Sequence, residues 1–163
     1  MTIIADASSL ILLAKITILE RLLEKNDIII PEKVYIEIIK GKEKGRFDAL
    51  IIEKLVQDKK IKIEKVDKEM FEKIWKLFGL WAGEGEAFVL ALKNKFPILT
   101  DDRKCINASK SANIPFITSP VIIVALFKKK SINKNKAEKS LELLEEYGWY
   151  NKNIIKFYKE KIK

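Results

Sequence analysis

The chain has 163 residues, of which 48% are hydrophobic and 34% are charged, so its composition is that of one globular domain rather than a disordered chain. It contains no histidine and one cysteine, which excludes Ser-His-Asp and Cys-His catalysis, most zinc sites and an internal disulfide. Carboxylates, hydroxyls, Lys and Arg remain as reactive groups, and carboxylates favour Mg²⁺ or Mn²⁺. The net charge of +9 favours an anionic partner such as nucleic acid, although a lysine-rich proteome gives the same charge.

No segment of the sequence has the pattern of a targeting or membrane-spanning segment. The amino terminus lacks a basic stretch ahead of an apolar one and reaches Asp6 early. The longest apolar runs, residues 28–31 and 120–127, are too short to cross a bilayer. We therefore expect a cytoplasmic protein with no membrane association, and the lone Cys105 fits a reducing compartment.

The first elements alternate between strand and helix. Residues 2–5 are a β-rich run that predicts a buried first strand. Ser8 and Ser9 are placed to cap the helix that follows. Thr17 and Glu20 have the spacing of a capping box, which predicts the start of a second helix.

The same alternation continues through the middle of the chain. Residues 27–30 are the next predicted strand, and Pro31 fits the first turn of a helix. A helix, a strand at 61–66 and another helix follow before Leu80. The remaining elements are a helix opened by Gly83 and Gly85, a strand at 97–100, a helix through Ala108, a strand at 115–118 and a helix started by Ser119 and Pro120. This order predicts an α/β, three-layer fold with a central, mostly parallel sheet flanked by helices.

Residues 131–163 form a distinct carboxy-terminal part. Two apolar stripes predict a pair of amphipathic helices joined near Gly148. From Lys128 onward there are eleven Lys and five Glu, so most of the net positive charge lies here. We expect a single domain over residues 1–163, with 131–163 as a helical extension packed on it. The stripes are Leu141, Leu144 and Tyr147 on the first helix, and Ile154, Phe157 and Tyr158 on the second.

Acidic residues follow two of the predicted strands. Asp6 comes after the first strand, and Asp101 and Asp102 come after the strand at 97–100. Sites in open α/β sheets form beyond the carboxyl ends of strands, so these acids are candidates for a shared site. Each also precedes a helix, so a role as N-cap is the simpler alternative for either position alone.

Two glutamates favour the shared site. Glu37 borders the buried face of its helix. Glu84 lies in the first turn of a helix and shares a stripe with Ala87 and Phe88, whereas Glu86 falls on a neighbouring face and is the weaker alternative. Three or four acids at one sheet edge repel one another unless a cation lies between them. Such a site suits hydrolysis of a phosphodiester by metal-activated water.

Four segments resemble, in order, the conserved motifs of PIN domains. The opening IIADASSLILLAK resembles the first motif, an acid after strand one followed by a hydroxyl. IIIPEKVYIEI resembles the second, and AGEGEAFVLALKNKFPILTDDR resembles the third and fourth together. The Gly-Glu-x-Glu-Ala form and the basic tail look most like the prokaryotic DUF3368 branch, which is related to VapC-type toxins.

The resemblance implies roles for particular residues. Ser8 would orient a carboxylate or a water at the metal. Basic residues would contact nucleic acid. The implied metal ligands are Asp6, Glu37, Glu84 and Asp102, with Asp101 as an alternative to Asp102, and Arg103 and Lys104 follow the acidic turn as nucleic-acid contacts. The positive charge of the carboxy-terminal part separately makes Lys128, Lys129 and Lys130 candidate nucleic-acid contacts, with a solvated lysine-rich face as the alternative. The branch has a Gly-Arg pair after its acidic turn, where this chain has Arg103 and Lys104, a difference that concerns substrate contacts.

The resemblance also implies a function and partners. It implies a Mg²⁺- or Mn²⁺-dependent endoribonuclease that acts on RNA, commonly forms a homodimer and is often the toxin neutralised by a cognate antitoxin. The alternative is a catalytically silent PIN-like module that binds RNA or regulates. Retention of all four acidic positions favours the enzyme, because a silent module has no reason to keep mutually repelling charges.

Overall fold

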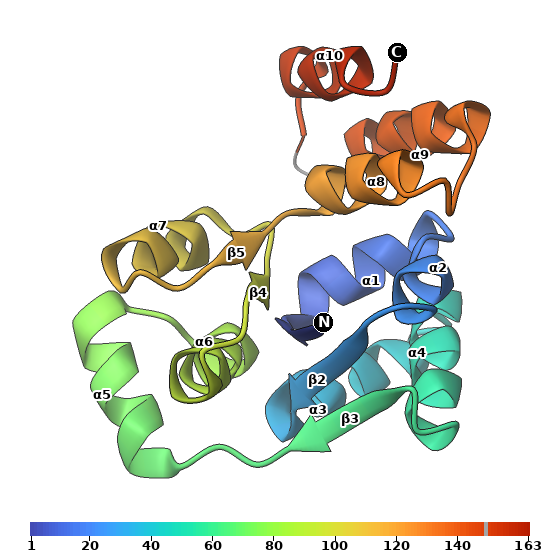
Figure 1. Cartoon of the computed structure of the whole chain (residues 1–163). Coiled ribbons are helices and arrows are strands. Elements are labelled where there is room, and N and C mark those ends of the chain that lie inside the picture. Colours follow the sequence, from blue (N-terminus) through green and yellow to red (C-terminus); the bar gives the residue numbers. More distant parts are fainter. Residues whose placement is uncertain (149) are drawn as a thin grey trace.

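Five parallel strands form the centre of the protein, shown as a computed structural model in Figure 1 that describes residues 1–148 and 150–163. The strands are ordered β3-β2-β1-β4-β5. The elements are β1 (Thr2–Ala5), α1 (Ala7–Lys15), α2 (Leu19–Leu23), β2 (Asp27–Pro31), α3 (Glu32–Lys42), α4 (Phe47–Gln57), β3 (Ile61–Glu64), α5 (Lys68–Phe78), α6 (Ala82–Asn94), β4 (Ile98–Leu99), α7 (Arg103–Ser111), β5 (Phe116–Ile117), α8 (Ser119–Lys128), α9 (Lys134–Tyr147) and α10 (Lys152–Glu160). The α/β prediction with a parallel sheet is confirmed.

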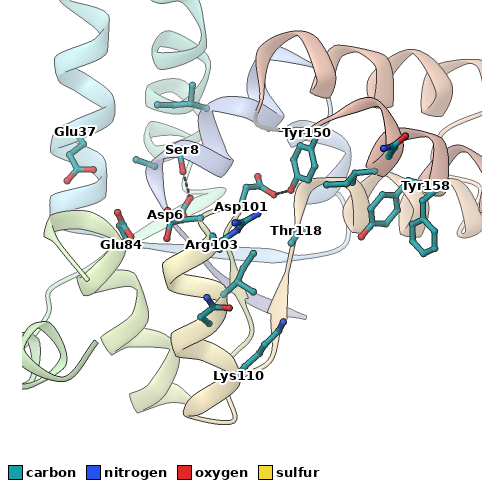
Figure 2. Close-up of a pocket in the computed structure, with 18 residues that line it drawn as sticks. Asp6, Ser8, Glu37, Glu84, Asp101, Arg103, Lys110, Thr118, Tyr150 and Tyr158 are labelled. Atoms are coloured by element: carbon teal, nitrogen blue, oxygen red, sulfur yellow. Dashed lines mark hydrogen bonds between the residues drawn. The ribbon is translucent and has the colours of Figure 1, made fainter. Parts of the chain in front are cut away.

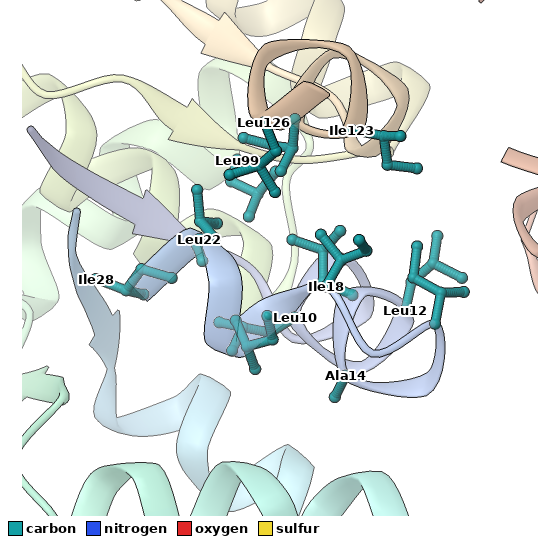
Figure 3. Close-up of a cluster of buried hydrophobic side chains, with 14 of the residues drawn as sticks. Leu10, Leu12, Ala14, Ile18, Leu22, Ile28, Leu99, Ile123 and Leu126 are labelled. Carbon is teal, nitrogen blue, oxygen red and sulfur yellow. The ribbon is translucent and has the colours of Figure 1, made fainter. Parts of the chain in front are cut away.

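The strand residues alternate between two hydrophobic clusters, because successive side chains of a strand point to opposite faces of the sheet. Ile3 and Ile28 pack with α1, α2, α4, α8 and the two carboxy-terminal helices. Ile4, Ile29 and Ile98 pack with α5, α6 and α7 on the other face. Figure 3 shows part of the first cluster, with Leu10, Ile18 and Leu126 gathered near the sheet. The sheet is therefore covered on both faces, as a parallel sheet requires.

The strand order places the acids at a switch point. The chain moves from β1 outward through β2 and β3, then returns to the other side of β1 with β4 and β5. The connection that follows β1 therefore runs toward β2, and the connection that follows β4 runs the opposite way, toward β5. Between them a crevice opens beyond the carboxyl ends of β1 and β4. Ala5 pairs with Leu99 in register, so Asp6 follows β1 directly at that crevice, and Asp101 follows β4 one residue later, after Thr100.

Two of the predicted capping assignments were wrong, and the alternative in which Asp6 caps the first helix is confirmed. Asp6, rather than Ser8 or Ser9, is the N-cap of α1, because its side chain accepts a hydrogen bond from the Ser9 amide. Thr17 is not a capping residue. Its φ of 57° places it in the left-handed turn between α1 and α2, and α2 begins after Ile18 with no side-chain cap. The left-handed turn at Thr17 is incompatible with the capping box that Thr17 and Glu20 predict, because an N-cap residue normally has an extended backbone.

The carboxy-terminal helices lie over α8. In Figure 1, α9 and α10 stack in turn beyond α8, away from β3, and α10 contacts both α9 and α8. The predicted apolar stripe of α10 does not form its buried face. Ile155 and Ile162 are buried, whereas Ile154 and Phe157 are 38% and 53% exposed. None of the described helices combines the length and the apolar character that crossing a bilayer requires.

Candidate metal-binding active site

A pocket opens beyond the carboxyl ends of β1 and β4, and it contains the predicted acids (Figure 2). Its two ends differ in chemistry. Carboxylates of the sheet and of α3 and α6 form one end, and aromatic and apolar side chains of the carboxy-terminal part form the other. The acidic residues that line it are Asp6, Glu37, Glu84, Asp101 and Asp102; the opposite end includes Tyr150, Ile154, Phe157 and Tyr158.

Asp6 lies at the deepest part of the acidic end, with only 3% of its surface exposed. Its Oδ1 accepts hydrogen bonds from the Ser9 amide at 2.9 Å and the Ser8 hydroxyl at 3.1 Å. Its Oδ2 is buried and accepts no hydrogen bond of good geometry from the described residues. Burial raises the pKa of Asp6 and the charge of Asp101 raises it further, while the Thr100 and Ser9 hydroxyls and the Ser9 amide oppose the rise. A buried oxygen without a donor is unfavourable unless a ligand or cation meets it.

The two neighbouring aspartates have different surroundings. Asp101 points toward Tyr150 in Figure 2, and its oxygens accept from the Tyr150 hydroxyl and from the Ser119 amide and hydroxyl. Asp102 instead caps α7 through a 2.8 Å bond from the Cys105 amide to Oδ1. The carboxylate of Asp101 is thus occupied by protein donors, and that of Asp102 only in part.

Glu37 and Glu84 complete the acidic end from two helices that face each other. Glu37 Oε1 accepts from the Gly83 amide at 3.0 Å, which ties α3 to the first turn of α6. Burial, followed by the charges of Asp102 and Asp6, raises the pKa of Glu84 to about 7. Glu86 lies outside the pocket lining and accepts a long 3.4 Å bond from the Lys33 amide. Of the two candidate glutamates, the structure brings Glu84 to the other acids.

Gly83 is required by the close approach of α3 to α6. A Cβ at this position would lie 2.8 Å from Glu37 Oε2 and 2.9 Å from Val34 Cγ2. Gly83→Ala is therefore expected to lower the free energy of unfolding by about 1–3 kcal/mol and to displace Glu37. Gly41→Ala is the matched control within α3, because its new Cβ meets only the flexible Arg46 side chain, at 3.3 Å and beyond. Urea unfolding of both variants measures the difference; equal stability of the two would contradict the predicted clash.

The raised pKa of Glu84 predicts a pH-dependent stability in metal-free protein. A folded-state pKa of about 7, above the ordinary 4.5, means that stability falls as pH rises between these values. Glu84→Gln removes this loss, so it should melt like the parent at about pH 4 and above the parent at about pH 8. The shift is moderated by solvent, because Glu84 is only half-buried. If Glu84→Gln melts lower at both pH values without metal, the carboxylate has a stabilising protein partner instead.

The donor set fits a hard divalent cation that keeps part of its water. All the candidate donors are carboxylate oxygens, which Mg²⁺ and Mn²⁺ prefer, and Asp6 Oδ2 is a buried acceptor that lacks a donor. Within residues 1–148 and 150–163, no three Asp, Glu or Cys side chains form a ready-made metal cage. Mg²⁺ is commonly held by one or two carboxylates with waters completing its shell, so the open arrangement suits this ion.

The predicted basic contacts divide into two groups. Arg103 lines the pocket, and the charge of Lys104 lowers the pKa of Glu84, so both lie near the acids. Lys128, Lys129 and Lys130 lie at the far end of α8, whose first turn is the end at the pocket. The length of α8 separates them from the acids by about 15 Å.

Several pocket residues were not predicted from the sequence. Lys110 and Asn107 come from α7, and Tyr150 and Asn153 from the carboxy-terminal part. The period of α7 could have indicated the first two, because Arg103, Asn107 and Lys110 recur at helical spacing after the acidic turn. No local signal links Tyr150 to Asp101, since the pair is 49 residues apart in the chain.

Comparison with known proteins agrees with this architecture. Residues 2–162 match the family described as DUF3368, a PIN domain. No curated protein is a significant match. The crystal structure of PAE2754 from Pyrobaculum aerophilum is similar with a TM-score of 0.56 and 18% sequence identity, covering 78% of this chain and 99% of that chain. At this identity the likeness concerns the fold alone.

Proposed function

Since the chain belongs to the DUF3368 family of PIN domains, we propose that it is a divalent-metal-dependent endoribonuclease. The observation that carries the proposal is the buried Oδ2 of Asp6, to which none of the described residues donates a hydrogen bond of good geometry. A second carboxylate, Glu84, lies near it with its pKa raised to about 7. Folding gathers like charges at this pocket at a cost in stability, and a cation offsets that cost. The proposed metal-binding residues are Asp6, Glu37, Glu84 and Asp102.

Each residue has a defined task in this proposal. Asp6 and Glu84 would hold the ion, and Ser8 keeps the Asp6 carboxylate in place through its hydroxyl. The Gly83 amide orients Glu37, and the Cys105 amide orients Asp102. A divalent ion, when bound, lowers the pKa of water and stabilises negative charge on phosphate oxygens.

Substrate binding would use the cations on α7. Arg103 and Lys110 line the pocket and are exposed, so they are available to phosphate oxygens. The net charge of +9 draws a polyanion toward the protein. Lys104 would contribute at the same rim, while Lys128, Lys129 and Lys130 would contact RNA away from the scissile bond.

Metal addition tests the proposal directly. Mn²⁺ binds the folded site alone, so a hundredfold excess over its dissociation constant should stabilise the parent by about 2.7 kcal/mol. The same ion should support internal cutting of RNA, and EDTA should stop it. Thermal unfolding and a gel assay measure the two effects. Absence of both effects would favour the catalytically silent, RNA-binding alternative.

Toxicity, antitoxin binding, a cytoplasmic location and homodimer formation are finer parts of the proposal, supported by family membership. Growth arrest on expression of the parent, and its relief by the product of a neighbouring reading frame, would test the toxin role. Sedimentation velocity at about tens of micromolar would test the dimer, and a monomer there would remove it.

A further inference from the structure

The end of the pocket opposite the acids is an aromatic wall on α10. Ile155 anchors this helix in the core and is 3% exposed. The neighbouring Ile154 and Phe157 line the pocket and are 38% and 53% exposed. An amphipathic helix normally buries its apolar stripe, so exposure of these two side chains toward a pocket calls for a ligand with an apolar surface.

Hydrogen bonds connect the aromatic wall to the acidic end of the pocket. Tyr150, just before α10, donates its hydroxyl hydrogen to Asp101, which also accepts from the Ser119 amide at 2.8 Å. Asp101 is adjacent in sequence to the proposed ligand Asp102. Figure 2 shows Tyr150 and Tyr158 on the side of the pocket facing away from Glu37 and Glu84. The aromatic side chains are thus held at a fixed position relative to the carboxylates.

One cation lies against the Phe157 ring, and further cations and amides line the same pocket. Lys161 Nζ lies 4.5 Å from the centre of the Phe157 ring, a cation–π arrangement. Lys110 and Asn107 line the pocket from α7, and Asn153 lines it from α10. Exposed rings flanked by cations are the combination that binds single-stranded nucleic acid, since bases stack on the rings and phosphates meet the cations.

We propose that α10 is a stacking wall for an unpaired nucleobase next to the carboxylate centre, with Phe157 as its principal ring. The inference rests on the proposed nuclease function and adds to it a subsite that receives the face of one unpaired base. Bases in a duplex present only their edges, so a ring in this pocket can reach a base face only where the strand is unpaired. A second copy of the chain fits the wall less well, because both copies carry a net charge of +9 and repel each other.

Binding without metal tests the wall independently of cutting. In EDTA, the fluorescence of 2-aminopurine in an oligoribonucleotide of about ten nucleotides should be quenched when the parent protein binds. Phe157→Ala should weaken binding about 5- to 150-fold, the range expected for loss of one base–aromatic stack. Phe157→Trp should keep the affinity, whereas Phe157→Leu should not restore it. Phe47→Ala, which removes a 73% exposed ring outside the pocket lining, should bind like the parent.

Several outcomes would overturn the wall: unchanged affinity of Phe157→Ala, full affinity of Phe157→Leu, or equally tight binding of the annealed duplex. A change in sedimentation of Phe157→Ala without loss of RNA affinity would show a docking surface for a second copy instead. The two proposals fail separately. Loss of binding in Phe157→Ala with no Mn²⁺-dependent cutting by the parent supports the wall and removes the nuclease. RNA cutting that depends on Asp6, together with RNA binding and cutting that do not depend on Phe157, supports the nuclease and removes the wall.

Discussion

Asp6→Asn is expected to reduce metal-dependent RNA cutting at least about a hundredfold, because loss of even an outer partner of a metal site commonly costs ten- to a hundredfold. The substitution removes the negative charge at Oδ2, the buried oxygen that receives no hydrogen bond from the part of the chain that the structure describes. The amide oxygen of asparagine can still accept the Ser9 amide bond that caps α1. The initial rate of internal cleavage of a labelled RNA with Mn²⁺ measures the effect, and circular dichroism checks that the fold persists.

Asp67→Asn is the matched control for this experiment. Asp67 caps α5 by accepting from the Met70 amide at 2.9 Å, as Asp6 caps α1, but it lies outside the pocket lining. It should cut at the rate of the parent. Equal losses in the two variants would mean that the cap matters and the metal does not. If Asp6→Asn cuts as well as the parent, a contaminating nuclease is the better explanation.

Asp101→Ala is expected to lower the free energy of unfolding by roughly 3–4 kcal/mol, because it leaves three donors without their carboxylate. Those donors are the Ser119 amide, the Ser119 hydroxyl and the Tyr150 hydroxyl. They join the start of α8 and the start of the α10 segment to the end of β4, so the loss should loosen the carboxy-terminal helices. Urea unfolding gives the stability, and hydrogen exchange shows where protection is lost.

Asp102→Ala provides the comparison. It removes one helix cap, the 2.8 Å bond from the Cys105 amide, and should cost about 1 kcal/mol. With Mn²⁺ the order should reverse: Asp102→Asn should lose most of the metal-induced stabilisation, and Asp101→Asn should keep it. A larger loss of metal response in Asp101→Asn would make Asp101 the ligand and would contradict the structural role assigned here.

Asp101 connects the aromatic wall to the acidic end of the pocket. The Tyr150 hydroxyl and the Ser119 amide meet on one carboxylate beside Asp102. Burial, then the charge of Asp101, raises the pKa of Tyr150 well above its usual value, so the phenol stays protonated as a donor. The Tyr150 hydroxyl therefore remains a hydrogen-bond donor to Asp101 at neutral pH.

The order of the strands and helices, and the acidic residues that follow two of the strands, could be predicted from the sequence alone. Periodicity placed the strand at residues 2–5 as the structure has it, and the strand–helix alternation predicted the parallel sheet. Asp6 and the Asp101–Asp102 pair followed strands, and the carboxyl ends of parallel strands meet at one edge. The strands, the helices and the acids that follow the strands can be predicted because they depend on residues close together in the chain.

The tertiary structure alone decided how the acids are used and what faces them. The packing of α6 brings Glu84 into the pocket lining and leaves Glu86 outside it. Asp101 differs from Asp102 because Ser119 and Tyr150, which are distant in the chain, donate hydrogen bonds to Asp101. The apolar stripe of α10 predicts from the sequence that Phe157 is part of the core, but Ile155 is buried instead. The positions of α8 and α9 decide which side of α10 is covered. Contacts between residues far apart in sequence have no periodic signature, so only folding reveals them.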